Sequence, residues 1–172
     1  MNKYSFLGLI LGFTFISSTA FAAVDPEVSY ILNTLLFLIG GFLVMWMAAG
    51  FAMLESGLVT SKSVATIAAK NIGLYSIAGL MFWFIGYNLA YGIPEGGFIG
   101  TLLPWSDASS IETGYSDGSD WFFQMVFCAT TCSIVSGTMA ERIKIWPFFL
   151  FCAILAGVIY PIEMGWQWGK GH

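Results

Sequence analysis

Aromatic side chains gather at the start of residues 121–142 and again near the end of the chain, and they could bind a small cation. Phe123 and Phe127 are four residues apart, so a helix would present both rings on one face. Trp168 follows later, two residues after Trp166. The face of a tryptophan ring attracts a small cation with about 0.5–2 kcal/mol, depending on desolvation. Such residues are equally typical of an aromatic belt at a membrane surface, so both interpretations stay open.

The sequence offers little for catalysis, metal binding or a cofactor. Its only histidine is the last residue, His172, which leaves no histidine-based triad or zinc site. Neither a GxGxxG nor a P-loop pattern occurs. Cys128, Cys132 and Cys152 lie inside apolar runs, where we expect them to pack as small apolar side chains. We therefore predict no enzyme activity, no cofactor and no metal ligand.

The elements that hold these side chains are expected to be membrane helices. Hydrophobic residues make up 58% of the 172 residues and charged residues only 9%, whereas a globular domain usually carries about 25% charged residues. The charges are also segregated, which leaves long uncharged windows in the sequence. Six Lys and Arg residues form no basic patch, so nucleic acid is excluded as a partner. We predict an all-α integral membrane protein embedded in the lipid bilayer.

Four apolar stretches are long enough to cross a bilayer, which takes about 20 residues. We expect transmembrane helices over about residues 30–54, 64–91, 121–140 and 145–162. In the third stretch small residues repeat every four positions, which allows helix backbones to approach closely. Lys70, in the first turns of the second stretch, is expected to anchor the helix end or to bond a neighbouring helix. Residues 92–120 are expected to form an irregular loop that carries five acids and no Lys or Arg: Glu95, Asp107, Glu112, Asp117 and Asp120.

Residues 1–22 have the pattern of a secretory signal peptide. Lys3 provides the positive charge, residues 4–16 the apolar region, and residues 20–22 (Ala-Phe-Ala) the cleavage pattern. The alternative is a retained first membrane span, for which this apolar region is short. The signal peptide is the favoured interpretation.

The positions of Lys and Arg predict the orientation. Lys62, Arg142 and Lys144 fall in the turns after the first and third spans, and the loop after the second span has none. Cytoplasmic loops are enriched in Lys and Arg, so these two turns are expected to be cytoplasmic. The N-terminus, after signal cleavage, and residues 92–120 would then lie outside. The protein is therefore expected to be a multi-pass protein of the inner (plasma) membrane.

Three segments resemble the ammonium transporter family, the Amt, Mep and Rh proteins. The first segment is GFAMLESGLVTSK at 50–62, followed by KNI at 70–72. The second, at 122–144, is FFQMVFCATTCSIVSGTMAERIK, which is similar to the family's third helix and its AER turn. The third, at 160–171, is YPIEMGWQWGKG, which resembles the segment between the fourth and fifth helices.

This resemblance implies the family's eleven-helix bundle of two inverted five-helix repeats, assembled as a homotrimer with one pore per subunit. It also implies transport of ammonium or ammonia, with methylammonium as an analogue. Phe127 matches the first phenylalanine of the outer gate, Phe123 an aromatic residue of the vestibule, and Trp168 the tryptophan that receives the cation. A slip of the alignment would give this last role to Trp166, although the following Gly169 favours Trp168.

The similarity covers residues 23–172, and several residues typical of the family are missing from this sequence. The second gate phenylalanine, the serine that bonds the cation, the aspartate of the fifth helix and both pore histidines have no counterpart. We therefore expect the N-terminal portion of a transporter domain, truncated before the fifth helix, and no conduction by this chain alone. Two alternatives stay open. One is a non-transporting small membrane subunit that docks a partner through its small-residue faces, and the other is an inactive truncated product.

Overall fold

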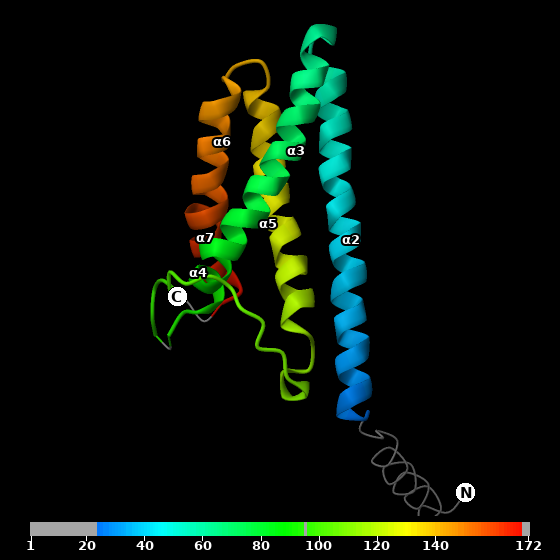
Figure 1. Cartoon of the computed structure of the whole chain (residues 1–172), viewed down its shortest axis with the longest axis vertical. Helices are drawn as coiled ribbons and strands as arrows, with labels where there is room; N and C mark the ends of the chain where they lie inside the picture. The colour runs from blue at the N-terminus through cyan, green and yellow to red at the C-terminus, as the bar shows by residue number, and fades with distance from the viewer. Residues whose placement is uncertain (1–23, 95, 170–172) are drawn as a thin grey trace, which may run out of the picture.

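The computed structural model describes residues 24–94 and 96–169, which form an all-α bundle of four antiparallel spans (Figure 1). Each span is long and apolar enough to cross a membrane: Pro26–Leu58, Ser61–Tyr91, Asp117–Met139 and Ile145–Gln167. No β-strand occurs in these described residues. The predicted fold class, all-α with four transmembrane helices, is confirmed. The predicted signal peptide, residues 1–22, lies outside the described part of the chain.

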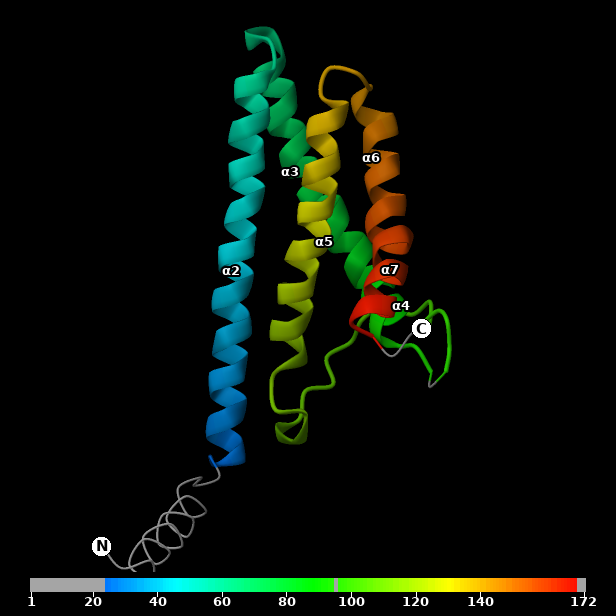
Figure 2. The same ribbon diagram turned by 180° about the vertical axis from the view of Figure 1, so that it is seen from behind.

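The first span is a single helix, α2 (Pro26–Leu58), at one edge of the bundle (Figure 2). It begins before the predicted position 30 because the carboxylate of Asp25 caps it, accepting a first-turn backbone N–H at 2.9 Å. Only two residues of α2 are buried. Most of its apolar side chains are therefore free to face lipid.

The second and fourth spans are each interrupted by a π turn of five residues. The second span consists of η1 (Ser61–Ser63), α3 (Val64–Met81), the π turn η2 (Phe82–Gly86) and α4 (Tyr87–Tyr91). The fourth consists of α6 (Ile145–Ile154), the π turn η4 (Leu155–Ile159) and α7 (Tyr160–Gln167). The two π turns pack against each other, and a Cβ on Gly86 would lie 3.1 Å from the carbonyl oxygen of Ala156. Such turns often occur near functional sites, and here each leads into a segment that bears aromatic residues.

The fourth span runs to Gln167, beyond the predicted end at residue 162. Glu163 is charged but lies on the exposed side of α7, so it does not end the helix. Trp166 is consequently a helical residue, and Trp168 follows as the C-cap.

The third span, α5 (Asp117–Met139), packs against α2 and α3. It starts before the predicted residue 121 because Asp117 and Asp120 lie in its first turn, where negative charge is favoured by the helix dipole. The preceding loop is irregular except for the short helix η3 (Ile111–Thr113). The backbone N–H of Trp105 in this loop donates to the carbonyl of Trp83 at 2.8 Å, which ties the loop to the second span.

The core lies between α3, α5 and α6. The largest fully buried side chains within it, Leu74, Phe82, Val126 and Phe148, are at most 1% exposed. The small residues of α5 form the surface that packs: Cys128, Ala129, Cys132, Ser133 and Ser136 are all buried. All three cysteines are free and buried, as expected for small apolar packing.

Lys70 forms the helix-to-helix bond that was one of its two expected roles. Its Nζ lies 3.0 Å from Oε2 of Glu55 on α2 and donates to the carbonyl oxygen of Ser136 on α5 at 3.0 Å. Lys70 and Glu55 are 4% and 2% exposed, so the pair is inside the bundle and does not anchor a helix end at the surface.

Candidate functional site

The three residues singled out from the sequence, Phe123, Phe127 and Trp168, line one cavity of about 460 Å³. We call it the aromatic cavity. It is formed by side chains from α2, α4, α5, α7 and the loops that precede α5 and follow α7. Its lining residues are Phe37, Tyr91, Tyr115, Asp120, Phe123, Gln124, Phe127, Tyr160 and Trp168.

Phe123 packs against two other rings of the aromatic cavity, edge to face with Phe127 and tilted against Phe37. The ring centroid of Phe123 lies 5.1 Å from that of Phe127, at an interplanar angle of 76°, and 5.3 Å from that of Phe37. Gly40 makes room for this arrangement, since a Cβ there would lie 2.8 Å from the Phe123 ring. Phe127 is 36% exposed and Trp168 is 73% exposed, so both rings can offer a face to a ligand.

The structure separates the two tryptophans that the sequence left exchangeable. The indole N–H of Trp166 donates to the carbonyl of Phe98 at 2.9 Å, and its ring packs 4.8 Å from the Phe98 ring. Trp168 lines the aromatic cavity, and its backbone N–H donates to Met164 at 2.8 Å. Trp166 is not among the lining residues, because its contact with Phe98 holds it away from the cavity.

Two polar residues of the cavity wall, Asp120 and Gln124, were not predicted from the sequence. Asp120 was expected in a solvated loop, whereas it lies in the first turn of α5 with 6% exposure. A detectable signal was present: residues 120, 124 and 127 follow the i, i+4, i+7 spacing of one helix face. Phe37 gave no such signal, because it reaches the cavity from a helix remote in sequence.

The negative charge of Asp120 acts on the phenol of Tyr115, another residue that lines the cavity. Burial, followed by the negative charges of Asp120 and Asp117, raises the pKa of the Tyr115 phenol. This phenol is therefore neutral at physiological pH. Among the described lining residues, Asp120 carries the formal charge of the cavity.

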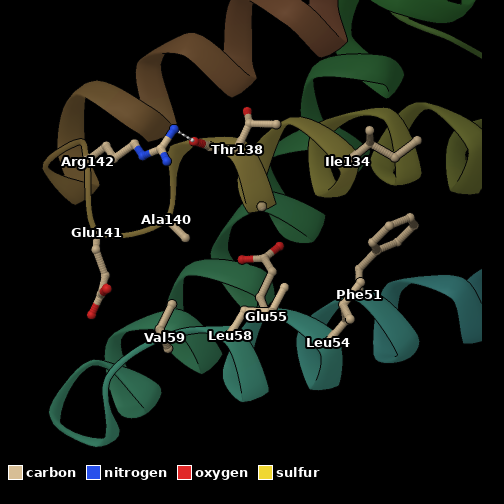
Figure 3. Close-up of a pocket in the computed structure, with 11 residues that line it drawn as sticks. Phe51, Leu54, Glu55, Leu58, Val59, Ile134, Thr138, Ala140, Glu141 and Arg142 are labelled. Atoms are coloured by element: carbon tan, nitrogen blue, oxygen red, sulfur yellow. Dashed lines mark hydrogen bonds between the residues drawn. The ribbon is translucent and has the colours of Figure 1, made fainter.

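A second cavity, of about 500 Å³, lies at the opposite end of the bundle between α2 and α5. Figure 3 shows the Glu55 side chain rising from α2 toward α5, with Thr138 and Arg142 on the far wall. Arg142 Nη1 donates to the carbonyl of Thr138 at 3.4 Å. Two carboxylates line this cavity: that of Glu55 is paired with Lys70, and that of Glu141 accepts the backbone N–H and the hydroxyl of Thr60. The described residues also contain no cluster of His, Cys, Asp or Glu that could hold a metal ion.

Comparison with known proteins decides what kind of protein contains this aromatic cavity. The Ammonium Transporter Family matches residues 35–172. The chain belongs to the ammonium transporter family. An ammonium transporter of Archaeoglobus fulgidus, Amt2, is 42% identical over 140 residues, which cover 78% of this chain and 28% of that protein. The ammonium transporter of Aquifex aeolicus is 31% identical over 180 residues, which cover 99% of this chain and 41% of that protein.

A solved structure has the same fold as this ammonium transporter family member. The structure titled "Sensor Amt Protein" superposes with a TM-score of 0.75 at 29% identity and covers 84% of this chain. The matched region is 36% of that protein. The resemblance predicted from the three sequence segments is thus confirmed. The chain spans less than half the length of these relatives.

Proposed function

We propose that the complete protein carrying this chain transports ammonium or ammonia across a membrane and first binds the cation in the aromatic cavity. The observation that supports this most is the meeting of Phe123, Phe127 and Trp168 in one cavity of an ammonium transporter family member. Trp168 is more than forty residues from the other two in sequence. Their convergence agrees with the roles that the family resemblance implies.

Each ring has a different task in this proposal. The exposed indole of Trp168 attracts the cation by a cation–π contact. Phe123 lines the wall, and Phe127 is a gate whose apolar ring gives a charge no polar partner. Because an unpaired charge is costly to move into apolar surroundings, passage beyond Phe127 favours neutral ammonia over ammonium. The chain's own residues bind and orient the substrate, and no enzyme activity is proposed.

The proposal includes an orientation and an assembly. The multi-pass protein lies in the inner (plasma) membrane, and residues 1–22 are a signal peptide whose removal leaves the N-terminus outside. Domain 23–172 then places the aromatic cavity at the outer surface and the turns bearing Lys62 and Arg142 in the cytoplasm. The complete protein assembles as a homotrimer, as in the family.

The orientation predicts the labelling of two cysteine variants in intact cells. Ile111→Cys should react with a membrane-impermeant maleimide, and Lys62→Cys should react only after the cells are opened, because the two positions lie on opposite sides of the membrane. Both side chains are exposed, and the three native cysteines are buried, which keeps the background low. The reverse pattern of labelling would contradict the orientation.

Replacement of Trp168 by leucine in the complete protein should raise the KM for methylammonium about 2- to 30-fold, because a cation–π contact of about 0.5–2 kcal/mol is lost. Uptake of labelled methylammonium over a range of concentrations measures this change. Trp146→Leu is the matched control, since Trp146 is 78% exposed and does not line the aromatic cavity.

Phe127→Ala in the complete protein should also alter methylammonium uptake, because it removes the ring that forms the proposed gate.

Unchanged uptake and affinity in both the Trp168 and the Phe127 variant would contradict the proposal that the aromatic cavity binds the cation. Absence of methylammonium uptake by the complete wild-type protein, despite normal amounts in the membrane, would favour a non-transporting subunit instead.

A further inference from the structure

Asp120 is a buried carboxylate in the wall of a cavity that is otherwise formed by aromatic rings and one amide. It is 6% exposed, and it lines the aromatic cavity together with Phe123, one turn along the same helix. A carboxylate in such surroundings loses much of its hydration. It requires partners that stabilise it in place.

Two neutral donors hold this carboxylate. The hydroxyl of Tyr87 donates to Oδ2 at 2.7 Å, and Nε2 of Gln124 donates to Oδ1 at 3.2 Å. Both bonds orient the group without cancelling its charge. Each carboxylate oxygen can accept a further hydrogen bond, so capacity for a ligand remains.

No basic side chain in the described part of the chain neutralises Asp120. The four Lys and Arg residues in this part of the chain all lie in or near the two turns at the opposite end of the bundle: Lys62, Lys70, Arg142 and Lys144. The one ion pair found among the described residues is that of Lys70 with Glu55. The charge of Asp120 therefore acts on whatever enters the aromatic cavity.

The neighbouring acids differ from Asp120 in position. Asp117 accepts the backbone N–H of Ala108 at 3.0 Å, and Asp107 accepts that of Ser109 at 3.0 Å, so both stabilise the loop. Neither lines the aromatic cavity. Asp107 is exposed, and Asp117, the first residue of α5, is half-buried. Water and salt screen these two charges more than the buried charge of Asp120.

We propose that Asp120 is the counter-charge of the aromatic cavity and makes this site selective for small monovalent ammonium-type cations over neutral molecules of the same size. The carboxylate supplies the long-range attraction, and the rings of Phe127 and Trp168 supply the short-range contact. This inference rests on the proposed transport function. It adds to that site a residue, Asp120, that favours the binding of a positively charged ligand.

The test compares methylammonium uptake by the complete protein with and without this charge. Asp120→Asn keeps the size of the side chain and should raise the KM about tenfold, with the maximal rate changed by less than about twofold. Asp107→Asn is the matched control, because it makes the same change in net charge outside the cavity. Its KM should equal that of the wild type.

A second variant leaves Asp120 in place and cancels its charge. Gln124→Lys puts an ammonium group one helical turn from the carboxylate, at the position of its neutral donor, and should raise the KM at least as much as Asp120→Asn. This variant decides the question if Asp120→Asn does not fold. Tyr87→Phe removes a neutral donor but no charge, so its KM should stay within about threefold of the wild type.

A wild-type KM in a folded Asp120→Asn variant, or in Gln124→Lys, overturns the inference. If Trp168→Leu still raises the KM in that case, the proposed transport site stands without Asp120. If Trp168→Leu and Phe127→Ala are also unchanged, the proposed site fails as well. A larger effect of Tyr87→Phe than of Asp120→Asn would assign the carboxylate a packing role.

Discussion

Replacement of Lys70 by methionine is expected to lower the free energy of unfolding by about 3–5 kcal/mol, because it leaves the carboxylate of Glu55 buried without its charged partner. Glu55 is 2% exposed, and its Oε1 has no hydrogen-bond partner among the described residues. Its Oε2 makes all the polar contacts of the group, with Lys70 Nζ at 3.0 Å, the Ser136 hydroxyl at 2.9 Å and the Asn71 amide at 3.4 Å. Methionine fits the space of the lysine stem but donates no bond.

The cost is large because this cluster joins four helices. Glu55 belongs to α2, Lys70 to α3 and Ser136 to α5. The Lys70 ammonium also lies 5.0 Å from the ring centroid of Phe148 on α6, in cation–π geometry. Loss of one side chain therefore weakens contacts between several helix pairs at once.

Unfolding curves of the purified complete protein in detergent measure this loss. Lys144→Met is the surface control, since Lys144 is exposed. The double variant with Glu55→Gln and Lys70→Met should recover much of the lost stability, because it buries no net charge. A single Lys70→Met variant as stable as the control, or a double variant no better than the single one, would contradict this account of the cluster.

Replacement of Gly165 by valine is the second change with a large expected effect. Gly165 lies where α7 crosses α4, and a Cβ there would lie 2.8 Å from the carbonyl oxygen of Ala90 and 2.8 Å from Cδ1 of Ile93. Gly169, four residues on, faces the same carbonyl, at 2.5 Å from its own added Cβ. Small residues at this spacing allow the two backbones to touch, and a backbone carbonyl cannot move aside as a flexible side chain can.

Valine at position 165 should therefore push α7 away from α4 and cost about 1–3 kcal/mol of stability. It should also raise the KM for methylammonium, because Trp168 follows directly after α7 and is placed by this crossing. Gly50→Val is the matched control: Gly50 is an exposed helical glycine, and nothing lies within 4 Å of its added Cβ. Thermal unfolding and uptake should separate the two variants, and equal results for both would refute the close crossing.

The sequence was sufficient for features that depend on local periodicity and composition. Segregated charges and four long apolar stretches predicted the four spans, because a bilayer imposes a minimum length on an apolar helix. The faces of α5 followed from its spacing, which put Phe123 beside Phe127 and aligned the small residues that the core buries. Three short segments were enough to predict the family.

Helix ends were predicted less well, since they depend on particular contacts. The start of α5 and the end of α7 both lie outside the predicted spans because charged residues there occupy the first turn of a helix or its exposed side. A polar residue in a sequence does not show whether it ends a helix or continues it toward water. For this reason Asp120 was predicted to lie in a loop, although it lies in the first turn of α5.

Only the tertiary structure decided which side chains from different helices meet across the bundle. Periodicity tells which side chains share a helix face, but the rotation and depth of each helix decide which face it meets. The π turn η4 and the crossing at Gly165 set the direction of α7, and so brought Trp168 rather than Trp166 to the aromatic cavity. The pairing of Lys70 with Glu55 and the burial of Asp120 beside Tyr87 arise in the same way, from helices that are distant in sequence and adjacent in space.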